Sequence, residues 1–102
     1  MIYLSNAFSI DMLSSKRAFI FVQRVSLGRV KYLLKKGFVS LVKDGNISKV
    51  LTKLLETDVP ITEERVKLKY GDKLIIVRFS KRISDTDNID DLKPRFAIIY
   101  IR

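Results

Sequence analysis

The chain has 102 residues, of which 20 are Lys or Arg and 11 are Asp or Glu, so its formal net charge at pH 7 is +9. This length fits one domain over residues 1–102, and a hydrophobic content of 47% argues against a disordered basic tail. Cysteine and histidine are both absent, which excludes disulfides, thiolate metal sites, Ser-His-Asp triads and imidazole acid–base chemistry.

No segment predicts contact with a membrane. The longest uninterrupted apolar run, Phe96–Ile101, covers six residues, whereas a spanning helix needs about 20. Met1–Ser14 lacks the positively charged start and long apolar stretch of a secretion signal. We therefore expect a protein that stays inside the cell. Many Lys, Arg, Ile and Val beside a single Gln are typical of proteins from hot environments.

The first half of the chain predicts three strands and a helix. Met1–Leu4 is a short strand followed by a polar loop, and Ala18–Val25 is a strand because it is β-branched and aromatic. Ser26 can cap a helix that runs to about Lys36. Phe38–Val42 then returns as a strand.

The clearest periodicity in the chain predicts a second helix. Asp44-Gly45-Asn46 is typical of a turn, and Asn46 can cap the helix that follows. Apolar residues recur at helical spacing over Ile47–Glu56, so one side of this helix faces the core.

The second half predicts a hairpin and a final strand. Apolar and basic residues alternate from Arg65 to Tyr70, and Gly71-Asp72 forms a turn into the strand Lys73–Arg82. Ser84–Asp91 is an acidic connection, and Phe96–Ile101 is the last strand.

These elements predict an α+β fold, with a mixed, mostly antiparallel sheet of about five to six strands covered by two main helices. Leu34–Val39 and Leu92–Ala97 enter a strand through similar residues. Two related strand–connection–strand halves with a groove at their junction would explain this similarity, and coincidence explains it equally well.

Basic residues near the predicted hairpin could hold phosphates. Arg65 and its neighbours Lys67 and Lys69 alternate along one strand, with Arg78, Lys81 and Arg82 close in sequence. The alternative is that lysines on an edge strand only prevent aggregation. For Arg82 we favour a functional role, because it follows a buried strand at a loop junction.

The acidic loop does not have the spacing of a metal site. Asp85, Asp87, Asp90 and Asp91 lie close together, but the central Gly and terminal Glu of a calcium loop are missing. We therefore predict no metal and no cofactor.

The segment Tyr3–Leu13 reads Y-L-S-N-A-F-S-I-D-M-L. It resembles the (Y/F)-L-x-N-A-F-S-I-N-M-L signature of the viral ring nucleases, a small family of archaeal-virus proteins that act as type III anti-CRISPR proteins. Ser80–Ile83 reads S-K-R-I where that family has S-Q-R-L. The resemblance covers nearly the whole chain, and its first segment is the most specific part.

The resemblance implies a homodimer that works in the host cytoplasm. Family members bind cyclic tetra-adenylate across the dimer interface and cleave it without metal into linear di-adenylates. By resemblance Asn6 and Ser9 would lie at the ligand, and a second set would meet phosphates or hold the site together: Arg65, Ser80, Lys81 and Arg82.

The sequence departs from this family at the acid–base residues. The family's histidine position falls on Asp44 or within one residue of it, and its glutamate position falls near Asp85. An ordinary aspartate is deprotonated at neutral pH and cannot donate a proton. Because acid catalysis is typically worth about 10²- to 10⁴-fold, we expect cleavage to be absent or much reduced. A protein that keeps the pocket would sequester the messenger.

Two other function classes remain open. The same fold could bind a protein or peptide that adds to a groove or sheet edge as a strand, since fold does not carry function with it. A plain nucleic-acid binder driven by the basic surface is the third hypothesis.

Overall fold

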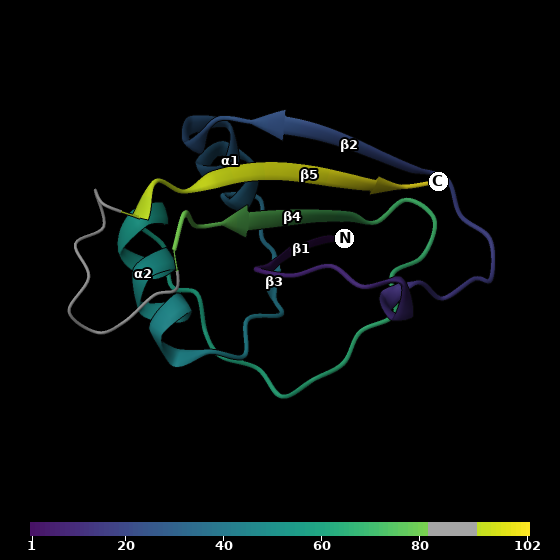
Figure 1. Ribbon diagram of the computed structural model, residues 1–102, viewed down its shortest axis with the longest axis horizontal. Helices are drawn as coiled ribbons and strands as arrows, with labels where there is room; N and C mark the ends of the chain where they lie inside the picture. Colours follow the sequence, from purple (N-terminus) through teal and green to yellow (C-terminus); the bar gives the residue numbers. More distant parts are fainter. Residues whose placement is uncertain (82–91) are drawn as a thin grey trace.

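The computed structural model describes residues 1–81 and 92–102, and Figure 1 shows them as one five-stranded sheet with two α-helices. The predicted α+β class is confirmed. The elements in chain order are β1 Ile2–Ser5, a 3-10 helix η1 Ile10–Met12, β2 Ile20–Val25, α1 Leu27–Leu34, β3 Val39–Ser40, α2 Gly45–Leu55, β4 Lys73–Arg78 and β5 Arg95–Ile101.

The strand order in the sheet is β2-β5-β4-β1-β3. β1 runs parallel to β3 and β4, whereas β5 runs antiparallel to β2 and β4. The carboxyl ends of β1, β3 and β4 therefore meet at one edge of the sheet. Figure 1 shows α2 beyond the tip of β4, at this same end.

Side-chain caps fix where both helices begin. The Ser26 hydroxyl accepts the Arg29 N–H at 3.2 Å, as predicted for α1. In α2 the cap is Asp44 rather than Asn46, because the Asp44 carboxylate accepts the N–H groups of Asn46 and Ile47. The prediction of Asn46 as the cap was wrong, and the helix begins at Gly45.

One face of the sheet is covered by both helices. Leu33 from α1 and Leu51 from α2 belong to the same buried cluster as Ile75 and Ile98 from the two central strands. Burial of such large apolar side chains is the dominant stabilising contribution to a small domain. The buried members of this cluster are Leu4, Val30, Leu33, Leu34, Val42, Leu51, Leu55, Val59, Ile75, Val77, Phe96 and Ile98.

The opposite face is covered in part by two irregular segments. Leu68 is 1% exposed and packs in a second cluster with Leu74 and Ile99, and partly buried Met12 and Leu13 pack against them. An isolated parallel bridge joins Leu13 to Leu68. Residues 8–13 and 66–68 thus hold each other against the sheet.

The predicted strand over residues 65–70 and its hairpin with β4 were wrong. β4 pairs with β1 on one side and with β5 on the other, so both of its edges are occupied. The alternating segment is instead laid across the face of the sheet, with Leu68 inside and Tyr70 82% exposed. The described sheet consequently has five strands, at the lower end of the expected range.

The two segments with similar residues, Leu34–Val39 and Leu92–Ala97, lead into strands that occupy different positions in the sheet. β2 and β3 lie at opposite ends of the sheet, whereas β4 and β5 are antiparallel neighbours. The arrangement therefore favours coincidence over two related halves.

No helix among the described residues is long and apolar enough to cross a membrane.

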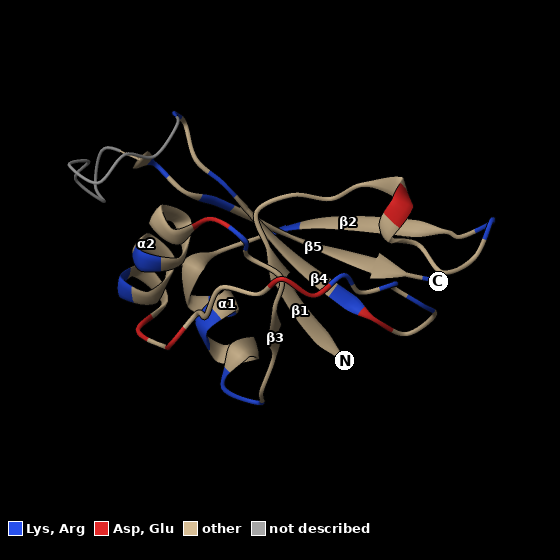
Figure 2. Cartoon of the chain, turned by 90° about the horizontal axis from the view of Figure 1, so that it is seen from below, with Lys and Arg blue, Asp and Glu red and all other residues tan. Residues whose placement is uncertain are grey.

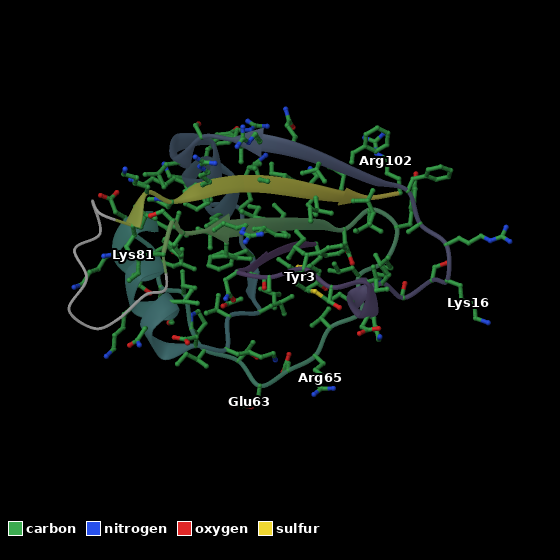
Figure 3. All side chains as sticks on the ribbon, viewed as in Figure 1. Tyr3, Lys16, Glu63, Arg65, Lys81 and Arg102 are labelled. Carbon is green, nitrogen blue, oxygen red and sulfur yellow. The ribbon has the colours of Figure 1, made fainter. Side chains whose placement is uncertain are left out.

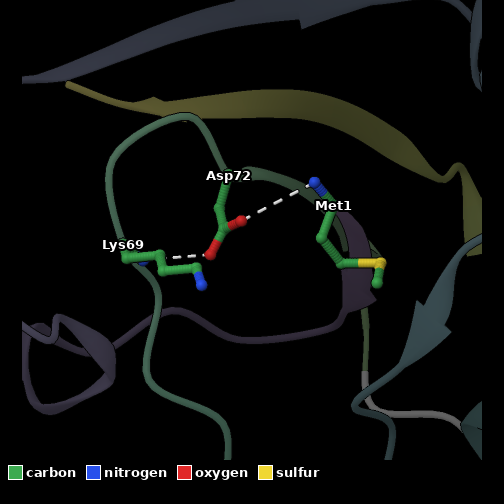
Figure 4. A network of polar contacts seen from close by, with 3 residues as sticks. All are labelled: Met1, Lys69 and Asp72. Atoms are coloured by element: carbon green, nitrogen blue, oxygen red, sulfur yellow. Dashed lines mark hydrogen bonds and ion pairs between the residues drawn. The ribbon is translucent and has the colours of Figure 1, made fainter.

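Asp72 organises the turn that leads into β4. Its buried carboxylate accepts the Lys69 N–H at 2.9 Å and lies 3.7 Å from the Met1 amino group (Figure 4). Tyr3 lies near the centre of the sheet (Figure 3). Its burial, and then the negative charge of Asp72, raise the pKa of the Tyr3 phenol.

Candidate functional site at the carboxyl edge of the parallel strands

The candidate site lies where the parallel strands end. Ser5 closes β1, Ser40 closes β3 and Arg78 closes β4. In open sheets of this kind, ligands commonly bind outside the carboxyl ends of parallel strands. Two hollows lie at this edge, and the residues that follow β1 contribute to both.

The larger hollow has a volume of about 750 Å³ and a mixed charge. Two of its cations are already engaged: the Lys43 ammonium donates to the Glu64 backbone carbonyl at 2.9 Å, and the Lys67 ammonium donates to that of Asp11. Arg65 makes no ion pair with the described part of the chain. The lining residues are Ser5, Asn6, Ala7, Asp11, Met12, Leu41, Lys43, Asp44, Glu64, Arg65, Val66 and Lys67.

The smaller hollow has a volume of about 460 Å³ and is more basic. Among the described residues, Arg78 and Lys81 supply its cations and Asp44 is its single acidic residue. Asn6 and Asp44 line both hollows, so these two residues lie between them. The structure thereby brings together two side chains that are 38 positions apart in sequence.

Asp44 occupies the N-terminus of α2 with its own carboxylate. Its Oδ1 atom lies 2.8 Å from the Asn46 nitrogen and 3.2 Å from the Ile47 nitrogen. Helix N-termini attract anions because their first N–H groups are unpaired and the helix dipole is positive there. An anionic ligand at this edge must therefore bind beside α2 and use the neighbouring cations.

The predicted site residues do not all lie at this edge. Ser9 is exposed and caps η1, where its hydroxyl accepts the Asp11 N–H at 3.2 Å. The Ser80 hydroxyl donates to the Leu92 carbonyl at 3.0 Å. Neither serine lines the two hollows. Arg82 and Asp85 lie outside the described residues.

Arg65 and Lys81 lie on different sides of the edge. Figure 3 shows Arg65 on the long connection below the sheet and Lys81 near the end of β4, well apart. Each lines one hollow, with Asn6 and Asp44 between them. A ligand that touches both cations must be extended, or must be large enough to cross both hollows.

A family model described as STIV B116-like matches residues 2–92 of the chain. The chain belongs to the STIV B116-like family. It is 24% identical over 101 residues to uncharacterized protein 26 of Sulfolobus islandicus filamentous virus (isolate Iceland/Hveragerdi). The aligned region covers 98% of this chain and 86% of that protein. This confirms the expectation of a small archaeal-virus protein.

The fold is also similar to a solved structure, that of B116 from Sulfolobus turreted icosahedral virus. The TM-score is 0.85 with 18% sequence identity, over 97% of each chain. At this identity the likeness concerns the fold alone. The STIV B116-like fold therefore accounts for the five-stranded sheet and its two helices, and the site must be argued from this chain's residues.

In this member of the STIV B116-like family, sequence reasoning missed a row of arginines on the sheet. Arg78 stands directly opposite Arg95 on β4 and β5, and Arg24 stands opposite Ala97 on β2 and β5. All three arginines line a further hollow of about 630 Å³. Figure 2 shows how basic residues are spread over strands, helices and loops. The pairing register, which is not local in sequence, is what gathers these three.

Proposed function

We propose that this small viral protein binds a cyclic oligoadenylate, with cyclic tetra-adenylate as the best candidate, and holds it without rapid cleavage. One observation carries the proposal: Asn6 and Asp44 lie between two hollows at the carboxyl edge of three parallel strands, with cations on both sides. Asn6 also belongs to Tyr3–Leu13, the segment whose resemblance to the viral ring nucleases is most specific.

The residue types suit a phosphate-bearing ligand. Arg65 and Arg78 carry planar guanidinium groups, which can grip two phosphate oxygens at once. The Asn6 side chain can both donate and accept, as recognition of a ribose hydroxyl or an adenine edge requires. A ring of four nucleotides presents its phosphates symmetrically, so the proposal includes a homodimer in which each chain supplies one such set.

The same geometry favours sequestration over cleavage. Attack by a ribose 2′-hydroxyl on its phosphate requires an acid that protonates the departing 5′ oxygen. The chain has no histidine, and Asp44 uses its carboxylate to accept two backbone N–H groups. These two bonds use the Asp44 side chain as a hydrogen-bond acceptor in the cap of α2. The messenger is made inside the host cell, so the proposal places the protein in the host cytoplasm.

Binding and cleavage of labelled cyclic tetra-adenylate by the full chain test this function in one assay. We expect binding at micromolar protein, with little linear product. Arg65→Ala should weaken binding about ten- to a hundredfold, because a hydrogen bond to a charged group contributes about 1.5–3 kcal/mol. Lys53→Ala removes the same charge from an exposed position on α2 and should leave binding unchanged.

Two results would contradict the proposal. Absence of binding at about 100 μM protein, which corresponds to a binding free energy weaker than about 5.5 kcal/mol, would exclude cyclic tetra-adenylate as the ligand. Rapid turnover would keep the ligand but replace sequestration by catalysis through a group other than imidazole.

A further inference from the structure

β2 is an edge strand whose outer side is unpaired in the described sheet. It pairs only with β5, at one end of the strand order (Figure 1). Phe19 and Arg102 exchange both of their backbone hydrogen bonds. Because antiparallel pairs alternate, every second residue from Phe19 onward directs its backbone toward β5. Ile20, Val22 and Arg24 therefore direct their N–H and C=O groups away from the sheet.

This edge has none of the usual features that prevent strand addition. Natural proteins protect an exposed edge with lysines, proline, bulges or a very short strand. β2 instead pairs with β5 over six consecutive residues without a bulge, and its single charged residue is Arg24. Apolar side chains of β2 and of the residue before it are open to solvent: Phe19 is 77% exposed, Phe21 is 56% exposed and Val22 is 65% exposed.

The arginine row lies on one face of the sheet, beside this edge. Residues that stand opposite each other in a ladder share a face, as do residues two apart along a strand. Arg24 is opposite Ala97, and Arg95 is two positions from Ala97 and opposite Arg78. The hollow lined by these arginines has an apolar floor on the same face, and Val22 is part of that floor. The other floor residues are Ile76, Ala97 and Ile99.

The arginine row has no anionic partner among the described residues. The ion pairs of residues 1–81 and 92–102 are Met1 with Asp72 and Lys31 with Glu56. Like charges directly opposite each other in a ladder are destabilising. A carboxylate brought next to Arg24 and Arg95 would therefore improve the electrostatics of this face.

We propose that the β2 edge binds an extended acidic segment of another protein as an added strand. The segment's backbone pairs with Ile20, Val22 and Arg24. Its side chains alternate, so a carboxylate can lie beside Arg24 and an apolar side chain two positions away can lie beside Val22. On the other face, an apolar side chain covers Phe21.

Charge and chemistry favour this occupant over two others. A second copy of β2 would bring another Arg24 and another chain of net charge +9, and would leave both arginine rows without an anion. A nucleic acid would neutralise the arginines but leave the outward N–H and C=O groups and the exposed phenyl rings uncovered. The two sites share Arg78, but the added strand is placed beside Arg24 and Arg95, which do not line the two hollows of the nucleotide site.

A synthetic peptide tests the proposal with the full chain. The probe is a blocked, fluorescein-labelled peptide of sequence Glu-Glu-Glu-Thr-Val-Val-Val-Thr, and its binding is followed by fluorescence anisotropy. We expect saturable binding in the micromolar range. A version N-methylated at every residue keeps the charge but has no N–H on either edge to pair with β2, and it should not bind. A version with Lys in place of Glu should not bind either.

Matched variants locate the site. Arg24→Glu should weaken binding of the acidic peptide at least about tenfold, which is about 1.4 kcal/mol. Lys16→Glu makes the same charge change on the exposed loop before β2 and should have little effect (Figure 3). Val22→Pro removes an outward N–H but none that pairs with β5, so it should preserve the fold and abolish peptide binding. Circular dichroism confirms folding of each variant.

Three outcomes would overturn the proposal. Equal binding of the N-methylated peptide would mean that charge alone attracts it. A dimer in sedimentation that Val22→Pro dissolves would assign the edge to a second copy. An oligonucleotide that binds tightly, loses affinity in Arg24→Glu and is unaffected by Val22→Pro would assign the arginines to nucleic acid. Loss of cyclic tetra-adenylate binding alone would affect only the nucleotide proposal.

Discussion

The Asp44 carboxylate accepts the backbone N–H of Asn46 at 2.8 Å and so closes the first turn of α2. The resemblance to viral ring nucleases puts the acid–base histidine at or next to this position, and the structure has a helix cap there. The same side chain also lines both hollows of the candidate site. The cap of α2 and the lining of the candidate site therefore share one carboxylate.

Loss of the cap should destabilise the protein. Asp44→Ala leaves two N–H groups of α2 without an acceptor and should lower the free energy of unfolding by about 1 kcal/mol, while Asp44→Asn should retain most of it. Urea unfolding of both variants measures this difference. Asn46→Ala is the control, since Asn46 is not the cap, and should change stability by less than about 0.5 kcal/mol. The reverse ranking of Asp44 and Asn46 would contradict the observed cap.

The segment from residue 65 to 70 allows a second stability test. Leu68 is 1% exposed against the sheet face, so Leu68→Ala should cost about 2–5 kcal/mol. Tyr70 is 82% exposed, and Tyr70→Ala should have an effect within about 0.5 kcal/mol. Chemical denaturation of the two variants measures both values. Comparable losses would indicate that the segment is a strand with both side chains packed, as its alternation suggested.

Local sequence patterns predicted most of the elements, and they failed where an element is defined by contacts between residues far apart in the sequence. The helical spacing from Ile47 onward and the β-branched run before Val25 were sufficient for α2 and β2. Residues 65–69 alternate because one side, with Val66 and Leu68, lies against the sheet, and a covering segment shares this pattern with a strand. Only the pairing of β4 with β1 and β5 excludes the hairpin, and the partners on β1 lie 71 positions before those on β4, as Ile2 and Lys73 do.

The candidate site could be predicted only in part for the same reason. Asn6 and Asp44 were identified by resemblance, and the structure places both at one edge. Ser9 and Ser80 line neither hollow: the Ser9 hydroxyl accepts the Asp11 N–H, and the Ser80 hydroxyl donates to the Leu92 carbonyl. The row formed by Arg24 and Arg95 depends on ladder register, which a single sequence does not contain.

The arginine pair across β4 and β5 predicts a variant that is more stable than the natural protein. Arg95 stands opposite Arg78 on the same face, and replacing like charges by opposite ones changes a cross-strand pair by about 0.2–1 kcal/mol. Arg95→Glu should therefore raise the urea midpoint above that of Arg95→Gln, which only removes the charge. In about 1 M salt the gap between them should shrink, because screening weakens exposed pairs. Identical midpoints at low salt would show that the two guanidinium groups do not interact.

The phenol of Tyr3 should make stability depend on alkaline pH. Burial, and then the charge of Asp72, raise the pKa of Tyr3 above the value of 10.0 for a free tyrosine. In the unfolded chain this phenol ionises near pH 10, whereas in the folded chain it stays protonated to higher pH. The unfolded state then binds fewer protons, so the free energy of unfolding falls as the pH rises above 10. Its stabilising contribution is fully present below pH 10 and is lost as the pH passes through the folded pKa. Tyr3→Phe lacks this group and should lose less stability between pH 9 and about 11 in urea titrations. Parallel profiles for the two proteins would mean that Tyr3 ionises as easily in the sheet as in water.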